Sequence, residues 1–350
     1  MHETMDFCGN ASSVHQAGNE AKKLIENARA EVAKSINAKD KDIIIFTSGA
    51  TEANNMVLKG SGCERILISA IEHSSITNTV PDAEIIPVLE NGVIDLEILE
   101  RMLKDNNRPT LISVMMVNNE TGVIQPIKEI MQMAKSLGAL VHTDAVQAIG
   151  RIELDLQDLG VDFMTLTAHK IGGPQGTGCL VVSNCNTIAP LITGGHQEKN
   201  LRAGTQNLIG IVGFGEAAKL AKTDMHKYQE LKKLRDKIEI EIKKIAPEAK
   251  FFGSNADRVS NVTMIATPDI SGETQLVALD VENICVSNGS ACTSGTVKKS
   301  RILEAMGASD NEATSAIRVS LGWNSTEKDV EYFLEKWTET YNRIKSRVKK

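Results

Sequence analysis

The feature that most constrains the fold is an alternation of short apolar runs with longer helical stretches through the first half of the chain. The runs of strand length are residues 43–46, 66–69, 85–89, 111–117, 140–143, 163–166 and 179–182. Helical patterns lie between several of them, at 50–58, 96–103 and 127–137, with another at 209–221. Strands joined by helices form βαβ units, whose parallel sheet is buried on both faces. The sequence therefore predicts an α/β fold with a mostly parallel seven-stranded sheet flanked by helices.

The remaining predicted elements are a helix before this core and a mixture of strands and helices after it. A first helix is predicted from about residue 11 to Ile36, with Ser12 or Ser13 as its cap. The second half has fewer strands, at 262–266 and 284–286, and amphipathic helices at 225–245, 273–280, 301–306 and 327–348. We predict a large α/β domain over residues 1–223 and a smaller α+β domain over residues 224–350.

Charge and cysteine usage exclude several classes of protein. The chain of 350 residues has a net charge of −6, which argues against a nucleic-acid partner, because binding phosphates needs a basic surface. No apolar run approaches the roughly 18 residues that span a bilayer, and the first residues do not resemble a secretory signal. The six cysteines contain no C-x-x-C pair, which indicates neither a disulfide framework nor a structural zinc site. We expect a cytoplasmic protein with no metal site and with free thiols, five of them buried: Cys8, Cys63, Cys179, Cys185 and Cys285.

Polar residues follow the predicted strands, at the edge where open α/β sheets bind their ligands. A turn of small residues, 47–52, precedes a helix and can hold an anion, although most such turns are simple caps. His73, Asp144 and Lys170 each follow another strand, and each has an ordinary structural explanation when taken alone. Together with the turn, they supply an anion site, a flat side chain that can lie on a cofactor ring, an acid that can pair with a protonated nitrogen of such a ring, and an amine that can form a Schiff base. Pyridoxal phosphate needs this combination.

One cysteine stands in an unusual setting. Cys292 lies in the run V286-S-N-G-S-A-C-T-S-G-T296, which is too small and polar to be buried. Free cysteine is among the most buried residue types, so an exposed thiol on a flexible loop indicates a chemical role.

With these residues the chain resembles the cysteine desulfurases of the class V, fold-type I pyridoxal-phosphate enzymes, in the branch that serves nitrogen fixation and iron–sulfur assembly. The matching stretches are G9-N-A-S-S-V-H15, F46-T-S-G-A-T-E-A-N54, E72-H73, V117-N-N-E-T-G122, H142-T-D-A-V-Q147, H169-K170, L201-R-A-G-T205, S287-N-G-S-A-C-T-S294 and I317-R-V-S-L-G322. They follow the family's order through almost the whole chain.

The resemblance implies a role for each matching residue. Lys170 would bind pyridoxal phosphate covalently, Asp144 would contact its ring nitrogen, His73 its ring face and Gln147 its ring oxygen. The cofactor phosphate would be bound by the backbone of Ala50, by Thr51, Thr167 and His169, and by Thr205 of a partner subunit, which implies a homodimer. Asn119 would lie at the cofactor, and with Arg318 it would hold the carboxylate of the substrate, L-cysteine.

The resemblance also explains the exposed thiol. Lys170 would remove the Cα proton of the bound cysteine, and the Cys292 thiolate would attack the substrate sulfur, which leaves alanine and a persulfide on Cys292. His73 is the candidate base near this thiol, whose ordinary pKa is about 8.5. The persulfide sulfur would pass to an iron–sulfur scaffold or another acceptor protein, with tRNA thiolation as a further use. The glycines beside Cys292 would let the loop move between these positions.

The sequence departs from the family in several places. The family ordinarily begins with a few tens of residues, including an Ala-Thr-Thr-Pro turn near the substrate, ahead of the Gly-Asn segment near which this sequence starts. Ala11 stands where proline is usual, G172-G-P-Q175 replaces Tyr-Gly-Pro-Lys, and Asn200 lies where a basic residue is expected.

Two other functions fit the same residues. One is another class V reaction, such as that of selenocysteine lyase. The other is a catalytically weak desulfurase-like scaffold that binds partners. We predict an active L-cysteine desulfurase.

Overall fold

The computed structural model describes residues 4, 9–104, 108–183, 186–288 and 299–348. Within them the chain forms two compact units. Unit 1 contains residues 1–86, 95–117 and 125–225, and unit 2 contains residues 87–94, 118–124 and 226–350. The predicted boundary after residue 223 misses two inner segments, 87–94 and 118–124, which pack with the C-terminal unit. The second of these segments is held there by Val123, which pairs with Arg258 in an antiparallel bridge.

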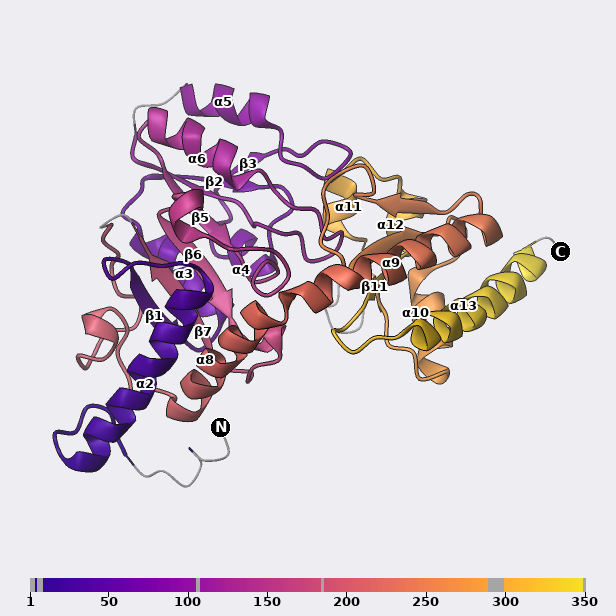
Figure 1. Ribbon diagram of the computed structural model, residues 1–350. Helices are drawn as coiled ribbons and strands as arrows, with labels where there is room; N and C mark the ends of the chain where they lie inside the picture. The colour runs from indigo at the N-terminus through magenta and orange to yellow at the C-terminus, as the bar shows by residue number, and fades with distance from the viewer. Residues whose placement is uncertain (1–3, 5–8, 105–107, 184–185, 289–298, 349–350) are drawn as a thin grey trace. The chain divides into compact units, whose positions relative to one another are not determined.

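Unit 1 is built on a seven-stranded sheet in the order β1-β7-β6-β5-β4-β2-β3. Figure 1 shows helices packed around this sheet. Its strands are β1 (Ile43–Thr47), β2 (Arg65–Ser69), β3 (Glu84–Ile86), β4 (Thr110–Ser113), β5 (Leu140–Asp144), β6 (Phe163–Thr167) and β7 (Gly178–Val182). Strand β7 runs antiparallel to β1 and β6, and the other neighbouring strands of the described sheet pair in parallel. The predicted α/β class and the mostly parallel seven-stranded sheet are confirmed.

Helices pack on this sheet because their apolar positions recur at helical spacing. They are α2 (Gln16–Ser35), α3 (Ala50–Gly60), α4 (Ser74–Thr77), α5 (Leu96–Lys104), α6 (Ile127–Ser136), α7 (Leu156–Leu159) and α8 (Leu208–Thr223), with short 3₁₀ turns η1 (Ala168–Ile171) and η2 (Glu198–Asn200). Ala53, Met56 and Val57 of α3 share a buried cluster with Ile45 and Phe163 of the sheet. Burial of such side chains supplies most of the stability of the unit.

Helix α2 begins later than predicted and has a different cap. Its first residue is Gln16, and the Nδ1 atom of His15 accepts a hydrogen bond from the Gly18 amide at 3.2 Å. The predicted caps, Ser12 and Ser13, are therefore wrong. Further along, α2 packs closely against α8, where a Cβ on Gly215 would lie 2.6 Å from the Cα of Ala28.

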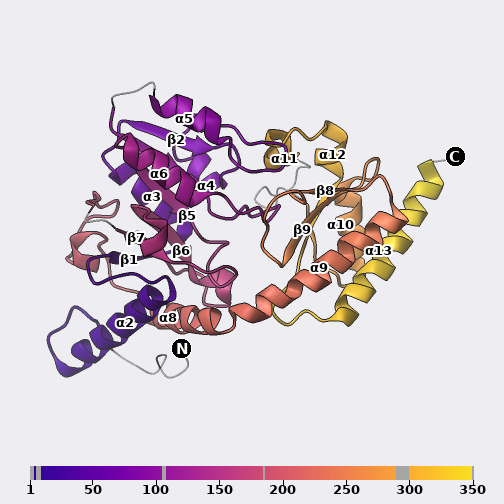
Figure 2. The ribbon, with the colours of Figure 1, turned by 45° about the horizontal axis from the view of Figure 1, so that its top comes forward.

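Unit 2 has a four-stranded antiparallel sheet in the order β10-β11-β9-β8. Its strands are β8 (Lys250–Phe252), β9 (Val262–Ala266), β10 (Ser287–Asn288) and β11 (Ala316–Ser320), and its helices are α9 (Met225–Ile245), α10 (Gly272–Val281), α11 (Arg301–Ala305), α12 (Asp310–Ser315) and α13 (Glu327–Val348). Helices α9 and α13 lie beside each other (Figure 2). Lys237 of α9 forms ion pairs with Glu327 and Glu331 of α13. Trp337 of α13 is buried in the core of this unit and donates to the Gln275 side chain at 3.0 Å.

Several sequence-based predictions in unit 2 are wrong. The strand predicted at 284–286 lies instead at Ser287–Asn288, and β8 and β11 were not predicted. Arg318 interrupts the apolar run of β11, and β8 has only three residues, so neither carries a clear strand pattern. The predicted burial of the cysteines, in both units, is only partly right. Cys285 of unit 2 is exposed and Cys63 of unit 1 is half-buried, while Cys179 of unit 1 is buried as expected. Cys8 and Cys185 lie outside the described residues.

None of the helices in the described ranges combines the length and apolar character needed to cross a membrane.

Candidate active site

Asp144 ends strand β5 as a fully enclosed carboxylate. The Asn54 side-chain amide donates to its Oδ2 at 2.9 Å, and the Val146 amide donates to its Oδ1 at 3.0 Å. Burial raises the pKa of Asp144, while these two hydrogen bonds and the positive charges of His73 and Lys170 act in the opposite direction. His73 and Lys170 are thus electrostatic neighbours of Asp144, as the sequence predicts from three separate strand ends.

A chain of hydrogen bonds connects His73 to Asp144. The Nδ1 atom of His73 accepts from the Ser75 amide at 3.1 Å and lies 2.9 Å from the Ser75 hydroxyl, and this capping geometry starts helix α4. Asn54 donates to the Ser75 hydroxyl at 2.9 Å as well as to Asp144. Because Nδ1 accepts a hydrogen bond, the neutral ring carries its proton on Nε2. His73 is therefore fixed in orientation and in tautomer.

Lys170 lies in η1, which follows β6 directly and leaves its side chain half-buried. Gly172 ends this turn with a φ of +78°, a left-handed conformation that glycine adopts without strain. Gly173 brings the backbone close to α8, since a Cβ there would lie 3.0 Å from the Cβ atoms of Ala168 and Ala217. The glycine-rich turn predicted after Lys170 thus fixes where the lysine backbone lies.

The residues predicted to bind a phosphate gather at one edge of the sheet. Thr47 of β1 and Thr167 of β6 both pair with Gly178 of β7, so the two strand ends lie two strand spacings apart, about 10 Å. Ala50 and Thr51 open helix α3 just beyond β1, and among the described residues no side chain caps this helix. Its first amide groups and its macrodipole therefore favour an anion there.

The Thr167 hydroxyl donates to the Thr177 carbonyl at 3.1 Å and lies 3.0 Å from Nδ1 of His169. Burial, and the nearby charge of Lys170, lower the pKa of His169. Thr167 and His169 therefore lie next to each other, and their predicted role in binding a phosphate stays a prediction.

Gln147 has a partner that the sequence did not suggest. Its Oε1 and its backbone carbonyl both accept from the Arg151 guanidinium, which also donates to the Lys170 carbonyl at 3.5 Å. With Oε1 engaged, the amide nitrogen of Gln147 is the group left to donate to a ligand. Arg151, Asn54 and Ser75 are the site residues that sequence reasoning missed.

In unit 2 the structure brings Asn119 and Arg318 together. The Arg318 guanidinium, on β11, donates to the Asn119 carbonyl at 2.8 Å. The Asn119 Oδ1 atom is buried and has no hydrogen-bond partner among the described residues. Two residues far apart in sequence thus lie next to each other. Their predicted role in holding the substrate carboxylate stays a prediction.

Comparison with known proteins decides the family. The sequence profile described as "Aminotransferase class-V" matches residues 1–333. The chain belongs to the class-V aminotransferase family. Among curated members it is 39% identical to the cysteine desulfurase IscS of Dictyoglomus turgidum, over 93% of this chain and 86% of that protein. It is also 39% identical to a cysteine desulfurase of Sinorhizobium fredii, over 94% of this chain and 88% of that protein. A solved NifS-like protein from Rickettsia africae superposes with a TM-score of 0.91 and 39% identity, over 97% of this chain and 94% of that one.

Two further residues of this class-V aminotransferase were predicted at the site. Thr205 is exposed, in the segment between η2 and α8. Nearby, Arg202 pairs with Glu52 of α3 at 2.8 Å, which ties this segment to the start of α3. Cys292 lies outside the described residues.

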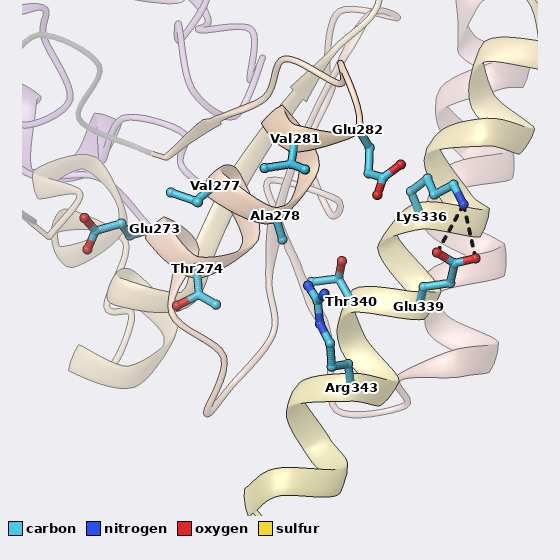
Figure 3. A pocket seen from close by; sticks show the side chains of 10 residues that line it. All are labelled: Glu273, Thr274, Val277, Ala278, Val281, Glu282, Lys336, Glu339, Thr340 and Arg343. Atoms are coloured by element: carbon cyan, nitrogen blue, oxygen red, sulfur yellow. Dashed lines mark hydrogen bonds and ion pairs between the residues drawn. The ribbon is translucent and has the colours of Figure 1, made fainter.

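A groove of about 710 Å³ lies elsewhere in unit 2, between α10 and α13 (Figure 3). Val277 and Val281 line one wall, and Lys336, Thr340 and Arg343 line the other. None of the residues that line it was predicted at the active site.

Proposed function

We propose that this class-V aminotransferase is a pyridoxal-phosphate-dependent L-cysteine desulfurase, a sulfurtransferase that converts L-cysteine to L-alanine and a persulfide on Cys292. The observation that carries the proposal is the cluster in unit 1, where His73 and Lys170 lie near the enclosed carboxylate of Asp144. The cysteine desulfurases among its relatives support the choice of reaction.

The residues of unit 1 fit pyridoxal phosphate. A buried carboxylate with a raised pKa is stabilised by a cation, and the protonated ring nitrogen of the cofactor is one. Lys170 would bind the cofactor covalently, His73 would lie on its ring face, and the free amide group of Gln147 would donate to its ring oxygen. The amide of Ala50, with Thr51, Thr167 and His169, would bind the phosphate.

Bound pyridoxal phosphate supplies an electron sink that weakens the bonds at the Cα of an amino acid. The Lys170 amine would take the proton from the Cα of L-cysteine. The Arg318 guanidinium would bind the substrate carboxylate beside Asn119, which is also the candidate residue next to the cofactor. His73, held with Nε2 as its proton-carrying nitrogen, would exchange protons with the thiol groups.

The sulfur step balances without an external oxidant. The thiolate of Cys292 would attack the sulfur of L-cysteine, the carbon–sulfur bond would break, and its electron pair would remain on carbon, which takes up a proton to give alanine. Two molecules of an external thiol would then reduce the persulfide, release sulfide and restore Cys292. In the cell an iron–sulfur scaffold or another acceptor protein would take the sulfur.

We also propose a homodimer in the cytoplasm, in which Thr205 of one chain reaches the phosphate of the other. The exposed position of Thr205 and the free thiols at Cys63, Cys179 and Cys285 support these proposals.

The test is to purify the protein with pyridoxal phosphate, record its visible spectrum, and add L-cysteine with a reductant. Equal amounts of sulfide and alanine support the proposal. Cys292→Ser should lose sulfide release and keep the cofactor band, whereas Lys170→Ala should lose the covalent band as well. A coloured protein that releases selenide from selenocysteine and no sulfide from cysteine would contradict the proposal, and so would a coloured protein without products.

A further inference from the structure

Glu120 is a buried acid in unit 2 to which the proposed chemistry gives no role. It is 6% exposed, and it directly follows Asn119, whose carbonyl oxygen accepts the Arg318 hydrogen bond at 2.8 Å. An acid at such a position needs partners, because an isolated buried carboxylate is costly.

The loop that carries Glu120 is fixed by its own hydrogen bonds. The Asn118 side-chain oxygen accepts from the amides of Glu120 and Thr121, at 3.0 and 2.9 Å. The Gly122 amide donates to the Asn118 carbonyl at 3.0 Å, with Gly122 in the left-handed conformation at a φ of +75°. The backbone is therefore held on both sides of Asn119.

The side chain of Glu120 ties this loop to helix α11. The buried Ser300 hydroxyl donates to Glu120 Oε2 at 2.5 Å and accepts from the Leu303 amide at 3.2 Å, which caps the helix. Since a hydroxyl has one hydrogen to give, Ser300 gives it to Glu120.

Glu120 ionises close to neutral pH. Burial raises its pKa to about 7, against the hydrogen bond from Ser300 and the positive charges of Arg318 on β11 and Arg301 on α11. Glu120 thus changes charge in the pH range where enzymes work, beside the guanidinium that faces Asn119.

We propose that Glu120 is a positioning residue for the Asn119–Arg318 pair, and that its charge sets how tightly Arg318 binds the substrate carboxylate. This inference rests on the proposed function, in which Arg318 binds L-cysteine. An ionised Glu120 offsets the positive potential of Arg318, so binding of an anion weakens. A neutral Glu120 leaves the full charge of Arg318 available.

The test compares KM for L-cysteine between the unaltered protein and Glu120→Gln as pH rises from about 6 to about 9. Glutamine keeps the shape and accepts the Ser300 hydrogen bond, but it stays neutral. The ratio of the two KM values cancels the ionisation of the substrate itself. We expect the KM of the unaltered protein, divided by the KM of Glu120→Gln, to be near one at low pH and to rise to about fivefold at high pH. The midpoint of this rise should lie at about pH 7, with little change in kcat.

Ser300→Ala provides a second reading of the same group. It removes a hydrogen bond that favours the ionised form of Glu120, so the midpoint of its own KM ratio to Glu120→Gln should move to higher pH. A midpoint that stays in place or moves to lower pH would contradict the role of Ser300.

Glu239→Gln is the matched control. Glu239 is a half-buried acid of unit 2, which accepts hydrogen bonds from Arg258 at 2.9 Å and from the Thr263 hydroxyl at 2.7 Å. Its KM ratio should not change with pH. Two outcomes would show that Glu120 is only structural. One is a KM ratio for Glu120→Gln that does not change with pH. The other is a lower melting temperature together with a lower kcat and a higher KM, changed by the same factors at every pH. An unaltered protein that releases no sulfide would instead overturn the proposed function and this inference with it.

Discussion

Replacing Asn54 by alanine removes the side-chain amide that donates to Asp144 at 2.9 Å and to Ser75 at 2.9 Å. The Asp144 carboxylate is fully enclosed, so the lost donor is not replaced by bulk water. A hydrogen bond to a buried charged group contributes about 2 kcal/mol. The pKa of Asp144, already raised by burial, should rise further in the variant.

The sign of the pH effect follows from that shift. A carboxyl group whose pKa is raised on folding stabilises the folded state most at low pH, and this stability is lost as pH rises through the folded pKa. Asn54→Ala should therefore lower the free energy of unfolding by about 2 kcal/mol at about pH 8 and by clearly less at about pH 5.

The assay is urea unfolding followed by circular dichroism at both pH values. Asn55→Ala is the matched control, because Asn55 lies next to Asn54 on α3 and its amide donates only to the Thr51 carbonyl among the described contacts. In an Asp144→Asn background the pH dependence of Asn54→Ala should vanish. An Asn54→Ala cost that is the same at both pH values, or that keeps its pH dependence in that background, would refute the hydrogen-bond account.

Three further variants test other parts of the structure by unfolding measurements. Glu120→Gln should stabilise the protein by up to about 3 kcal/mol at about pH 8 and very little at about pH 4, because burial raises the pKa of Glu120 to about 7; an equal effect at both would contradict this. Burial acts to raise the pKa of Glu52, yet hydrogen bonds from Arg202 and Ser48 hold it below its ordinary value. Arg202→Ala should therefore cost about 1 kcal/mol at neutral pH, a loss that fades as pH falls through the folded pKa; a loss independent of pH would count against the pair. Gly215→Ala should cost about 2 kcal/mol, since its Cβ would lie 2.6 Å from the Ala28 Cα; an unchanged melting temperature would show that α2 and α8 can separate freely.

The sheet of unit 1 was predictable because its strands are short apolar runs and its helices have a different period. The strands β1, β2, β5, β6 and β7 lie within a residue of their predicted bounds. The positions of Asp144 and Lys170 followed from the same reasoning, since the carboxyl ends of parallel strands meet at one edge.

Other features depend on contacts that local sequence does not encode. The chain from His73 through Ser75 and Asn54 to Asp144 joins three segments, and only the folded sheet brings them together. The available signal for Asn54 was its spacing, three and four residues before Val57 and Leu58, which places a polar side chain on the apolar face of the predicted helix.

Strand β11 shows the same limit in unit 2. Arg318 interrupts its apolar residues and hides the strand pattern. The partner that explains this arginine, Asn119, is 199 residues away in sequence. Residues 118–124 likewise pack with unit 2 although their neighbours in sequence belong to unit 1.

The central claim, sulfur transfer to Cys292, is tested most directly by a single turnover without reductant. The protein loaded with pyridoxal phosphate is mixed with less than one equivalent of L-cysteine per active site, so that no thiol is left over to reduce a persulfide. Alanine is quantified, and the mass of the peptide that contains Cys292 is measured by mass spectrometry. The account predicts one alanine per L-cysteine added, no free sulfide, and a Cys292 peptide heavier by one sulfur atom. Cys292→Ser should form neither alanine nor sulfide, and its peptide should gain no mass. Alanine formed without added sulfur on Cys292, or equally by Cys292→Ser, would contradict it.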